Sequence, residues 1–440
     1  MIRRLVVLGA ATVAVLAVVV AGRVAPEEPV VAAPYEGEVT PAAQPVACPG
    51  TVEIPVGDID SGDPDLGSGS DDRTYQALGD GTEPTGAGFL AEGDVAASVE
   101  RIGGGDVAGL SAASCVAPVR DQWLVGGSTA LGSSARLVLT NPSDASTEAT
   151  VTLYGGLGEL EEHAVVSIAP GGQQDLLLES VVAEVPALAV RVVATGAGVV
   201  AHLQDSRLDG FQPAGTDWVG RGSAPSTRLV VPGVGAEAED AATTLRLMAP
   251  DGATADLMLA GDEGLVEWGG VSGLALEPGV VTEVEVPALA SGAVEIRADA
   301  PVVAGAMISV TRPVVDGPAD AVERDLAWLP AQDTTDRKRR SVMVTDHVSA
   351  VTVHAAVAGE FTLTDADGEV IVSQQMAARS TATIPLEVPA GTVLTGPARF
   401  TWSLALEDEP GFVATLVPRR TDVESTPVTV GLRPYLGPGS

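Results

Sequence analysis

Downstream of residue 72, short segments of alternating apolar and polar residues follow one another, separated by turns rich in Gly, Pro and Asp. Alternation with a period of two is typical of β-strands that bury one face, and closely spaced turn residues indicate that the strands are short. No convincing stretch with the period of a helix follows the apolar run at the N-terminus. The pattern therefore predicts an all-β protein built from sandwiches.

The strongest internal signal is repetition. Two alternating strands around a Pro/Asp turn are followed by a strand, a Pro-Gly turn and another strand, and then by a closing hairpin that ends on Val-Val-Ala. The segments of the first copy are 135–155, 165–178 and 188–204, and those of the second copy are 244–261, 273–286 and 292–308. A third, more diverged copy occupies 360–372, 380–391 and the runs RFTWSLAL and GFVATLVP.

Tryptophans mark the junctions between the copies. Trp123, Trp218 and Trp328 each precede a repeat, with spacings of 95 and 110 residues. A spacing of about 100 residues matches an immunoglobulin-like sandwich. The fold class expected is all-β, with tandem immunoglobulin-like β-sandwiches at 115–216, 217–324 and 325–440, the last including a C-terminal tail. Residues 46–114 form a β segment with an acidic loop around 58–72. The order of the strands cannot be read from the pattern.

The N-terminus predicts a membrane segment. Arg3 and Arg4 precede an uncharged, mostly aliphatic run over 5–22, which is about as long as a bilayer core is thick when helical. We expect residues 1–23 to be a transmembrane helix or signal anchor, with the C-terminus outside the cell membrane. A cleaved signal, with a secreted product, is the alternative. Residues 24–45 are rich in Pro, Ala and Glu and are expected to form a stalk.

Composition and charge narrow the functional classes. The chain of 440 residues is 45% hydrophobic and only 19% charged, which excludes wholesale disorder. Its formal net charge of −35 makes binding to bare nucleic acid improbable, so no nucleic-acid partner is expected.

The two cysteines fit an oxidising compartment. We expect Cys48 and Cys115 to form a disulfide that ties the N-terminal segment to the first repeat. Two buried free thiols are the alternative. A metal site is disfavoured because no His lies at ligand spacing from either cysteine.

One basic cluster stands out in this acidic chain. It consists of Arg337, Lys338, Arg339 and Arg340, at the front of the third repeat. Such a run could hold an anionic partner, for example a phosphate-bearing envelope polymer or a lipid head group. The alternative is a solvated loop that balances an acidic body. The tryptophans could stack on sugar rings, but their regular placement favours packing under the ends of the sandwiches.

No motif predicts catalysis, a metal or a cofactor. The run at 196–201 matches G-x-G-x-x-A but joins two strand-like segments, so it predicts a hairpin turn. The acidic residues at 58–72 lack the spacing of an EF-hand, which would need Glu in place of Gly69. The four histidines are scattered, and no nucleophile elbow is present. We therefore expect no catalytic residue, no metal and no cofactor, and the protein is not expected to be an enzyme.

Several local motifs resemble a known family. A Val-Ala-Cys-Pro-Gly segment is followed by Asp-Gln-Trp-Leu-Val-Gly-Gly, which opens a sandwich carrying Leu-Thr-Asn-Pro and later Gly-Val-Val-Ala. This arrangement resembles an uncharacterised family of actinobacterial membrane-anchored or secreted proteins with tandem β-sandwich repeats. The resemblance implies an envelope protein without established activity, associated with envelope glycosyltransferases.

These observations predict a non-enzymatic, extracytoplasmic scaffold of the cell envelope. It would interact with another envelope protein, for example as an accessory subunit of an envelope-synthesis enzyme, and attach to the membrane through its N-terminal helix. A carbohydrate-binding module for a cell-wall glycan is the alternative, and a hydrolase of an envelope glycan is the third hypothesis.

Overall fold

The computed structural model describes thirteen stretches of the chain: residues 35–39, 45–53, 71–77, 83–85, 88–91, 96–210, 212–235, 241–269, 271–313, 322–336, 338–408, 411–420 and 426–430. The chain divides into two compact units. The larger is Ala43–Asp422, and the smaller joins Met1–Ala42 with Val423–Ser440. In the smaller unit, β1 (Tyr35–Val39) pairs antiparallel with β33 (Thr426–Val430).

Most of the predicted N-terminal features lie outside the described residues. This applies to the membrane helix at 1–23, to the stalk except residues 35–39 and 45, and to residues 58–70 of the acidic loop. Within the described stretches, no helix is long and apolar enough to cross a membrane. Inside the predicted stalk, β1 forms a strand because its partner comes from the opposite end of the chain, which local composition cannot indicate.

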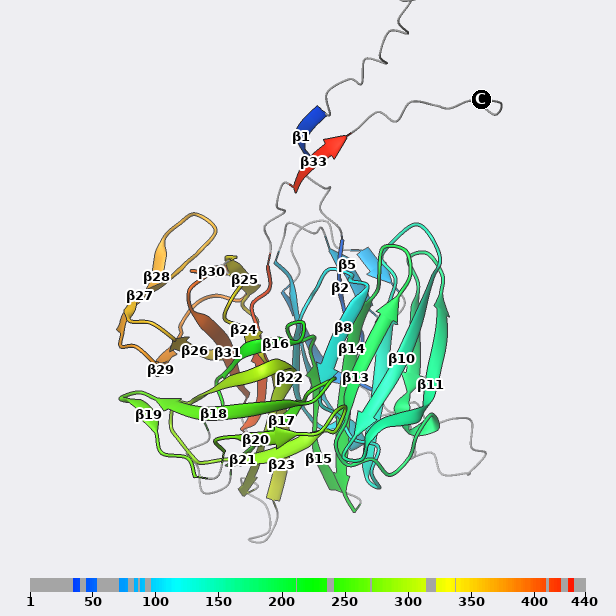
Figure 1. Cartoon of the computed structure of the whole chain (residues 1–440), viewed down its shortest axis with the longest axis horizontal. Coiled ribbons are helices and arrows are strands. Elements are labelled where there is room, and N and C mark those ends of the chain that lie inside the picture. Colours follow the sequence, from blue (N-terminus) through cyan, green and yellow to red (C-terminus); the bar gives the residue numbers. More distant parts are fainter. Residues whose placement is uncertain are drawn as a thin grey trace, which may run out of the picture. The chain divides into compact units, whose positions relative to one another are not determined.

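The first repeat contains eight strands in two antiparallel sheets (Figure 1). They are β8 (Asp121–Val125), β9 (Ser133–Thr140), β10 (Thr147–Gly155), β11 (Gly158–Ile168), β12 (Gln173–Leu177), β13 (Ala189–Ala194), β14 (Val200–Asp209) and β15 (Gln212–Val219), with a short 3-10 helix at Leu178–Ser180. One sheet has the order β11-β10-β13-β8 and the other β12-β9-β14-β15. Leucine, valine and alanine side chains from both sheets fill the space between them.

The second repeat uses one long strand in both of its sheets. Its strands are β16 (Ser226–Pro232), β17 (Ala241–Met248), β18 (Ala253–Gly261), β19 (Gly264–Val266), β20 (Leu274–Leu276), β21 (Thr282–Val286), β22 (Ala293–Pro313) and β23 (Val322–Pro330), and β24 (Gln332–Asp333) adds to β16. The first half of β22 pairs with β16 and β18, and its second half pairs with β17 and β23. A strand that passes between two sheets in this way makes a corner.

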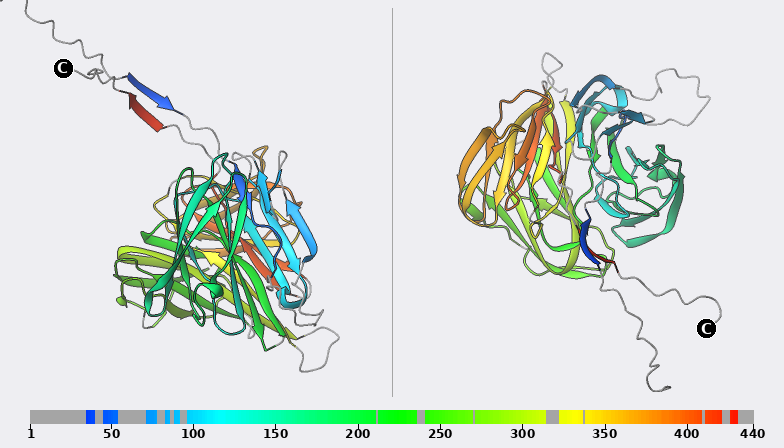
Figure 2. Two further views of the ribbon diagram at one scale, coloured as in Figure 1. Left: turned by 90° about the vertical axis from the view of Figure 1, so that its right-hand side faces the viewer. Right: turned by 90° about the horizontal axis from the view of Figure 1, so that it is seen from above.

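The third repeat again has two four-stranded sheets. Its strands are β25 (Arg340–Met343), β26 (Val348–Ala355), β27 (Gly359–Thr364), β28 (Val370–Met376), β29 (Ser380–Pro385), β30 (Val393–Gly396), β31 (Thr401–Asp408) and β32 (Phe412–Leu416). The sheet orders are β25-β30-β27-β28 and β29-β26-β31-β32. Figure 2 shows the strands of this repeat, yellow to orange, and those of the first repeat, cyan to green, as separate groups.

All three repeats share one strand order. Numbered within a repeat, the strands run 4-3-6-1 in one sheet and 5-2-7-8 in the other, and in the second repeat β22 supplies both the sixth and the seventh strand. In a constant immunoglobulin domain the first strand pairs with the second, and the seventh pairs with the sixth. Here the first strand pairs with the sixth and the seventh with the second. The topology therefore differs from the immunoglobulin order. The sequence pattern did not reveal this difference, because alternation shows the buried face of a strand but not its neighbours.

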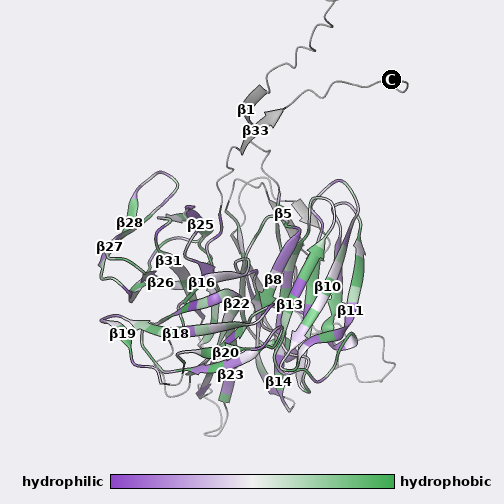
Figure 3. Cartoon of the chain, in the orientation of Figure 1, coloured by the Kyte–Doolittle hydropathy of each residue, from purple (hydrophilic) through white to green (hydrophobic). Residues whose placement is uncertain are grey.

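The all-β prediction is confirmed. Hydrophilic and hydrophobic residues occur along the same strand, for example in β8 and β11 (Figure 3). Burial alternates along β10 and β18, as expected for strands with one buried face. The predicted boundaries at 216/217 and 324/325 each fall inside a strand, β15 and β23 respectively. These strands close their own repeats, and their Trp residues mark the end of a repeat as well as the start of the next.

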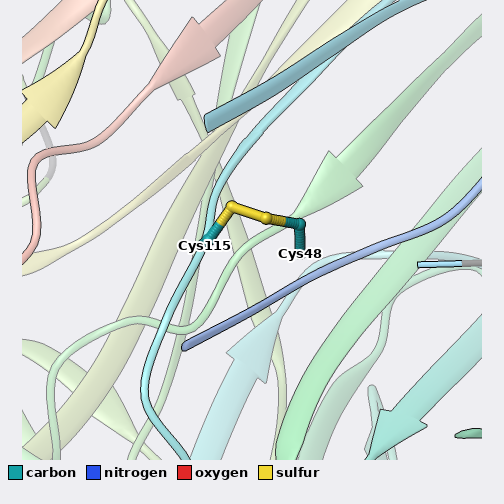
Figure 4. Close-up of a disulfide and its surroundings, with 2 residues drawn as sticks. All are labelled: Cys48 and Cys115. Carbon is teal, nitrogen blue, oxygen red and sulfur yellow. A yellow bond between two sulfur atoms is a disulfide. The ribbon is translucent and has the colours of Figure 1, made fainter. Parts of the chain in front are cut away.

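The N-terminal segment adds two small sheets to the larger unit. One contains β2 (Val46–Cys48), β5 (Gly88–Ala91) and β4 (Glu83–Thr85), and the other contains β3 (Asp71–Ala77), β6 (Ser98–Gly103) and β7 (Gly109–Ser114), with a short 3-10 helix at Gly105–Val107. The predicted disulfide is confirmed: Cys48 is bonded to Cys115, directly after β7 (Figure 4). Two backbone hydrogen bonds between Ala47 and Val116, of 2.9 and 3.1 Å, hold the same two segments together.

Candidate functional site

Four edge strands from different sheets meet inside the larger unit, and two buried aspartates join them. Asp217 of β15 accepts hydrogen bonds from the backbone N–H of Ala112 in β7 (3.1 Å) and of Trp328 in β23 (2.7 Å). Asp325 of β23 accepts from the N–H of Leu110 in β7 (3.1 Å) and of Val413 in β32 (2.8 Å). The carboxyl groups thus satisfy backbone donors that edge strands would otherwise leave open. We call this arrangement the aspartate junction.

Burial dominates the electrostatics of the aspartate junction. It raises the pKa of Asp325 to about 8, although backbone N–H groups oppose the shift. Burial also raises the pKa of Asp217 well above its usual range. The strands approach so closely that Gly215, at φ +105°, has room for no side chain: a Cβ there would lie 2.5 Å from the backbone nitrogen of Leu326.

A cavity of about 560 Å³ lies beside the aspartate junction. Its lining comes from β7, β8, β14, β15, β23, β25 and β32 and from the segments that follow several of these strands. Its volume is in the range of about 300–1,000 Å³ that is typical of small-molecule sites. The cavity is therefore the candidate functional site in the described part of the chain.

Basic side chains gather around this cavity. Five line it, and we call them the basic rim: Arg221, Lys338, Arg340, Arg419 and Arg420. The lining also includes three acidic side chains, of Asp121, Asp333 and Asp336, so the lining has two more basic than acidic groups. Asp121 is already paired with Arg191, at 3.0 and 2.6 Å. A local excess of positive charge is unusual in a chain with a net charge of −35.

Three distant segments of the chain build the basic rim. Arg221 follows β15, Arg340 begins β25, and Arg419 and Arg420 follow β32. An isolated bridge joins Ser341 and Arg419 through backbone hydrogen bonds of 2.7 and 2.9 Å. This bridge places the two basic runs, at 338–340 and 419–420, side by side.

Asp336 lies among these cations. Its carboxylate accepts a hydrogen bond from Nε of Arg420 at 2.5 Å and lies 3.6 Å from Nη2 of Arg340. Arg340 also donates to the side chain of Gln332 and, at 3.1 Å, to the carbonyl of Asp333. Arg340 is therefore held from within the protein, whereas the side chain of Arg420 is about half exposed.

The cations of the basic rim are close enough to affect one another. Burial, together with the charge of Arg420, lowers the pKa of Arg221 to about 10. Burial also lowers the pKa of Arg340, with Asp336 opposing the shift and Arg420 adding to it. An anion bound between these arginines would reduce their mutual repulsion.

Several uncharged side chains also line the cavity. Burial lowers the pKa of His202 to about 4, so its ring is neutral at pH 7. Gln122 donates to the carbonyl of Val199 at 2.9 Å. Trp123, Trp218 and Trp328 are also among the lining residues. The charged lining residues outside the basic rim are Asp121, Asp333 and Asp336.

Only part of the predicted anion-binding cluster lines the cavity. Lys338 and Arg340 line it, whereas Arg339 is exposed and is not among the lining residues. Arg337 lies outside the described residues. Sequence reasoning missed Arg221, Arg419 and Arg420. A signal for two of them existed, because the chain has adjacent basic residues only at 3–4, 337–340 and 419–420.

The tryptophans pack inside the protein, as the sequence favoured. Trp123, Trp218, Trp328 and Trp402 are at most 4% exposed, and Trp268 is partly buried against the second core. None of the four buried rings offers a flat surface to a sugar. In the stretches that the structure describes, no group of three or more His, Cys, Asp or Glu side chains could hold a metal ion.

Comparisons with known proteins give a family but no activity. A family model described as "Family of unknown function (DUF5719)" matches residues 76–389. No curated protein matches the chain. Among solved structures, a "Biofilm associated protein - BSP domain" is similar at 10% identity and a TM-score of 0.20, over 79% of this chain and 66% of that chain. The chain thus spans about two thirds of that structure, and a likeness this weak carries no argument.

Proposed function

We propose, for a chain that belongs to the DUF5719 family of unknown function, that it is a non-enzymatic protein of the cell envelope that acts as a rigid extracytoplasmic scaffold. In this proposal the three repeats and the N-terminal segment form one body that presents fixed surfaces to an envelope protein. The predicted segment at 1–23 would attach this body to the membrane, or would direct its secretion if it is cleaved.

The aspartate junction is the observation that carries the proposal. Asp217 of the first repeat and Asp325 of the second bind backbone groups of the N-terminal segment and of the second and third repeats. Further contacts join the second and third repeats, including a bidentate pair in which Arg379 contacts Glu295 at 2.8 to 3.2 Å. Repeats joined only by linkers would move independently. Buried bonds between repeats instead support a body with a fixed arrangement.

The disulfide supports a location outside the cytoplasm. Disulfides persist in oxidising compartments and are rare in reducing ones. Cys48 and Cys115 are both fully buried and bonded, and the bond joins positions 67 residues apart. It therefore contributes to the fold and is not placed for exchange at the surface.

Crosslinking in cells, followed by mass spectrometry, tests the scaffold proposal. We expect the full chain to capture one envelope protein in fixed proportion, with crosslinks from more than one repeat. The variant Asp325→Ala, which loosens the aspartate junction, should lose this pattern, whereas the exposed control Asp144→Asn should keep it. Recovery of wall polymer alone, without a stoichiometric protein, would contradict the scaffold and favour a glycan-binding module. Release of reducing ends from wall material would contradict the non-enzymatic assignment.

A further inference from the structure

The basic rim and the interior of the cavity differ in character, and this difference defines a ligand with two parts. The rim has Arg221, Lys338 and Arg420 approaching from three segments, while Asp336 is shared between Arg340 and Arg420. The lining also includes the uncharged residues Gln122 and His202 and three tryptophans. An anionic group suits the first region, and an uncharged polar group suits the second.

Phosphate is the anion that the basic rim fits best. A phosphate group has several oxygen acceptors in different directions, so cations that approach from different sides can each donate to it. Arginine is also the residue best suited to phosphate, because its planar fork donates two parallel hydrogen bonds. Arg221 and Arg420 already lie close enough for the charge of one to lower the pKa of the other. A phosphate between them would replace repulsion by attraction on both sides.

The charge of the whole chain limits the size of this anion. With a net charge of −35, the protein repels long polyanions, whose charges extend beyond the cavity. A single phosphate placed inside the rim interacts mainly with the nearby cations, because charges farther away than a Debye length of about 8 Å are largely screened at physiological salt. The cavity volume of about 560 Å³ leaves room for an organic part of the size of a sugar.

We propose that this cavity binds a small organic phosphate, with its phosphate group held between Arg221, Lys338 and Arg420 and its uncharged part in the interior beside Gln122 and His202. The proposal does not depend on the scaffold role. A sugar phosphate has the required chemistry, whether it is free or is the phosphorylated end of a larger envelope molecule.

Titration calorimetry with the full chain tests this site, using inorganic phosphate, glucose 1-phosphate and glucose as probes. Trp123, Trp218 and Trp328 line the cavity, so tryptophan fluorescence provides a second readout. We expect glucose 1-phosphate to bind more tightly than inorganic phosphate, and glucose alone not to bind. Arg420→Gln and Arg221→Gln should each weaken glucose 1-phosphate on the order of tenfold, because each removes a charge-assisted contact.

Arg339→Gln is the matched control, because Arg339 belongs to the same basic run but does not line the cavity. It should leave the affinity unchanged. Arg420 is about half exposed, so its replacement tests binding without a large change in the core. Absence of binding by both phosphates, or equal weakening by Arg339→Gln, would overturn the site. Equal affinity for inorganic phosphate and glucose 1-phosphate would overturn the role of the interior and leave a simple anion site, which the proposal does not allow.

Discussion

Replacing Asp325 with Asn is expected to change how the stability of the protein depends on pH. Asp325 is 1% exposed, and its Oδ2 accepts the backbone N–H groups of Leu110 and Val413. An asparagine has nearly the same shape, and its carbonyl oxygen can accept the same two hydrogen bonds. Unlike the carboxyl group, the amide cannot lose a proton. The substitution therefore removes one titration and keeps the geometry of the aspartate junction.

The sign and size of the effect follow from the pKa of Asp325. Its ordinary value is 3.8, and burial raises it to about 8 in the folded protein. Between these two pH values the folded state keeps a proton that the unfolded state has released, so stability falls as the pH rises from about 4 to about 8. The difference between the two pKa values corresponds to a loss of at most about 6 kcal/mol over that range. Asp325→Asn should remove this contribution.

Urea unfolding of wild type and variant at pH 5, 7 and 8.5 measures the effect. We expect the variant to be slightly more stable than the wild type at pH 5, and this difference to increase with pH and to be largest at pH 8.5. Asp325→Ala should instead lose about 2–6 kcal/mol at pH 5, because two buried N–H groups lose their acceptor. The exposed Asp144→Asn serves as the control and should follow the wild type. If the difference between wild type and Asp325→Asn does not change with pH, Asp325 is not protonated in the folded state and the reasoning is wrong.

Three further predictions concern contacts between distant segments. Cys115→Ser should lower the stability by on the order of 4 kcal/mol, because it removes the disulfide between positions 67 residues apart. The loss is measured as a lower urea midpoint, and an unchanged midpoint would contradict it. Arg136→Ala should lower the stability by about 3–5 kcal/mol, because Arg136 is 1% exposed and pairs with Glu53 at 2.6 Å. Backbone hydrogen exchange at 45–53 should become faster, and unaltered exchange would refute this contact. Burial opposes the ionisation of Glu295, but its bonds to His354 and Arg379 outweigh burial and lower its pKa to about 2. The wild type should therefore lose stability as the pH falls from 4.5 to about 2, whereas Glu295→Gln should show no such loss.

Several features of the fold could be predicted from the sequence, because they depend on residues close together in the chain. Alternation marked the strands and their buried faces, and repetition marked three copies of one unit. The pairing of Cys48 with Cys115 followed from a chain with only two cysteines. The burial of Trp218 and Trp328 followed from their regular placement at the ends of repeats. Each of these inferences needs only local pattern or counting.

The candidate site could be predicted only in part. Lys338 and Arg340 belong to a basic run that is visible in the sequence, and both line the cavity. The run does not act as a unit, because Arg340 is buried against Gln332 while Arg339 is exposed and does not line the cavity. Arg221 is a single arginine in a glycine-rich loop and carries no signal at all. Its role depends on a neighbour, Arg420, that is 199 positions away in the numbering of the chain.

The all-β class, the threefold repeat and the disulfide could be inferred from the chain before it folds, because alternation, repetition and the number of cysteines are properties of the sequence. Tertiary structure alone decided the strand order, the sharing of β22 between two sheets and the pairing of β1 with β33. It also decided that two aspartates would join four edge strands and that basic residues from three segments would surround one cavity. The physical reason is that pairing and burial depend on which distant segments meet, and hydrophobic pattern specifies a buried face without specifying the surface that covers it.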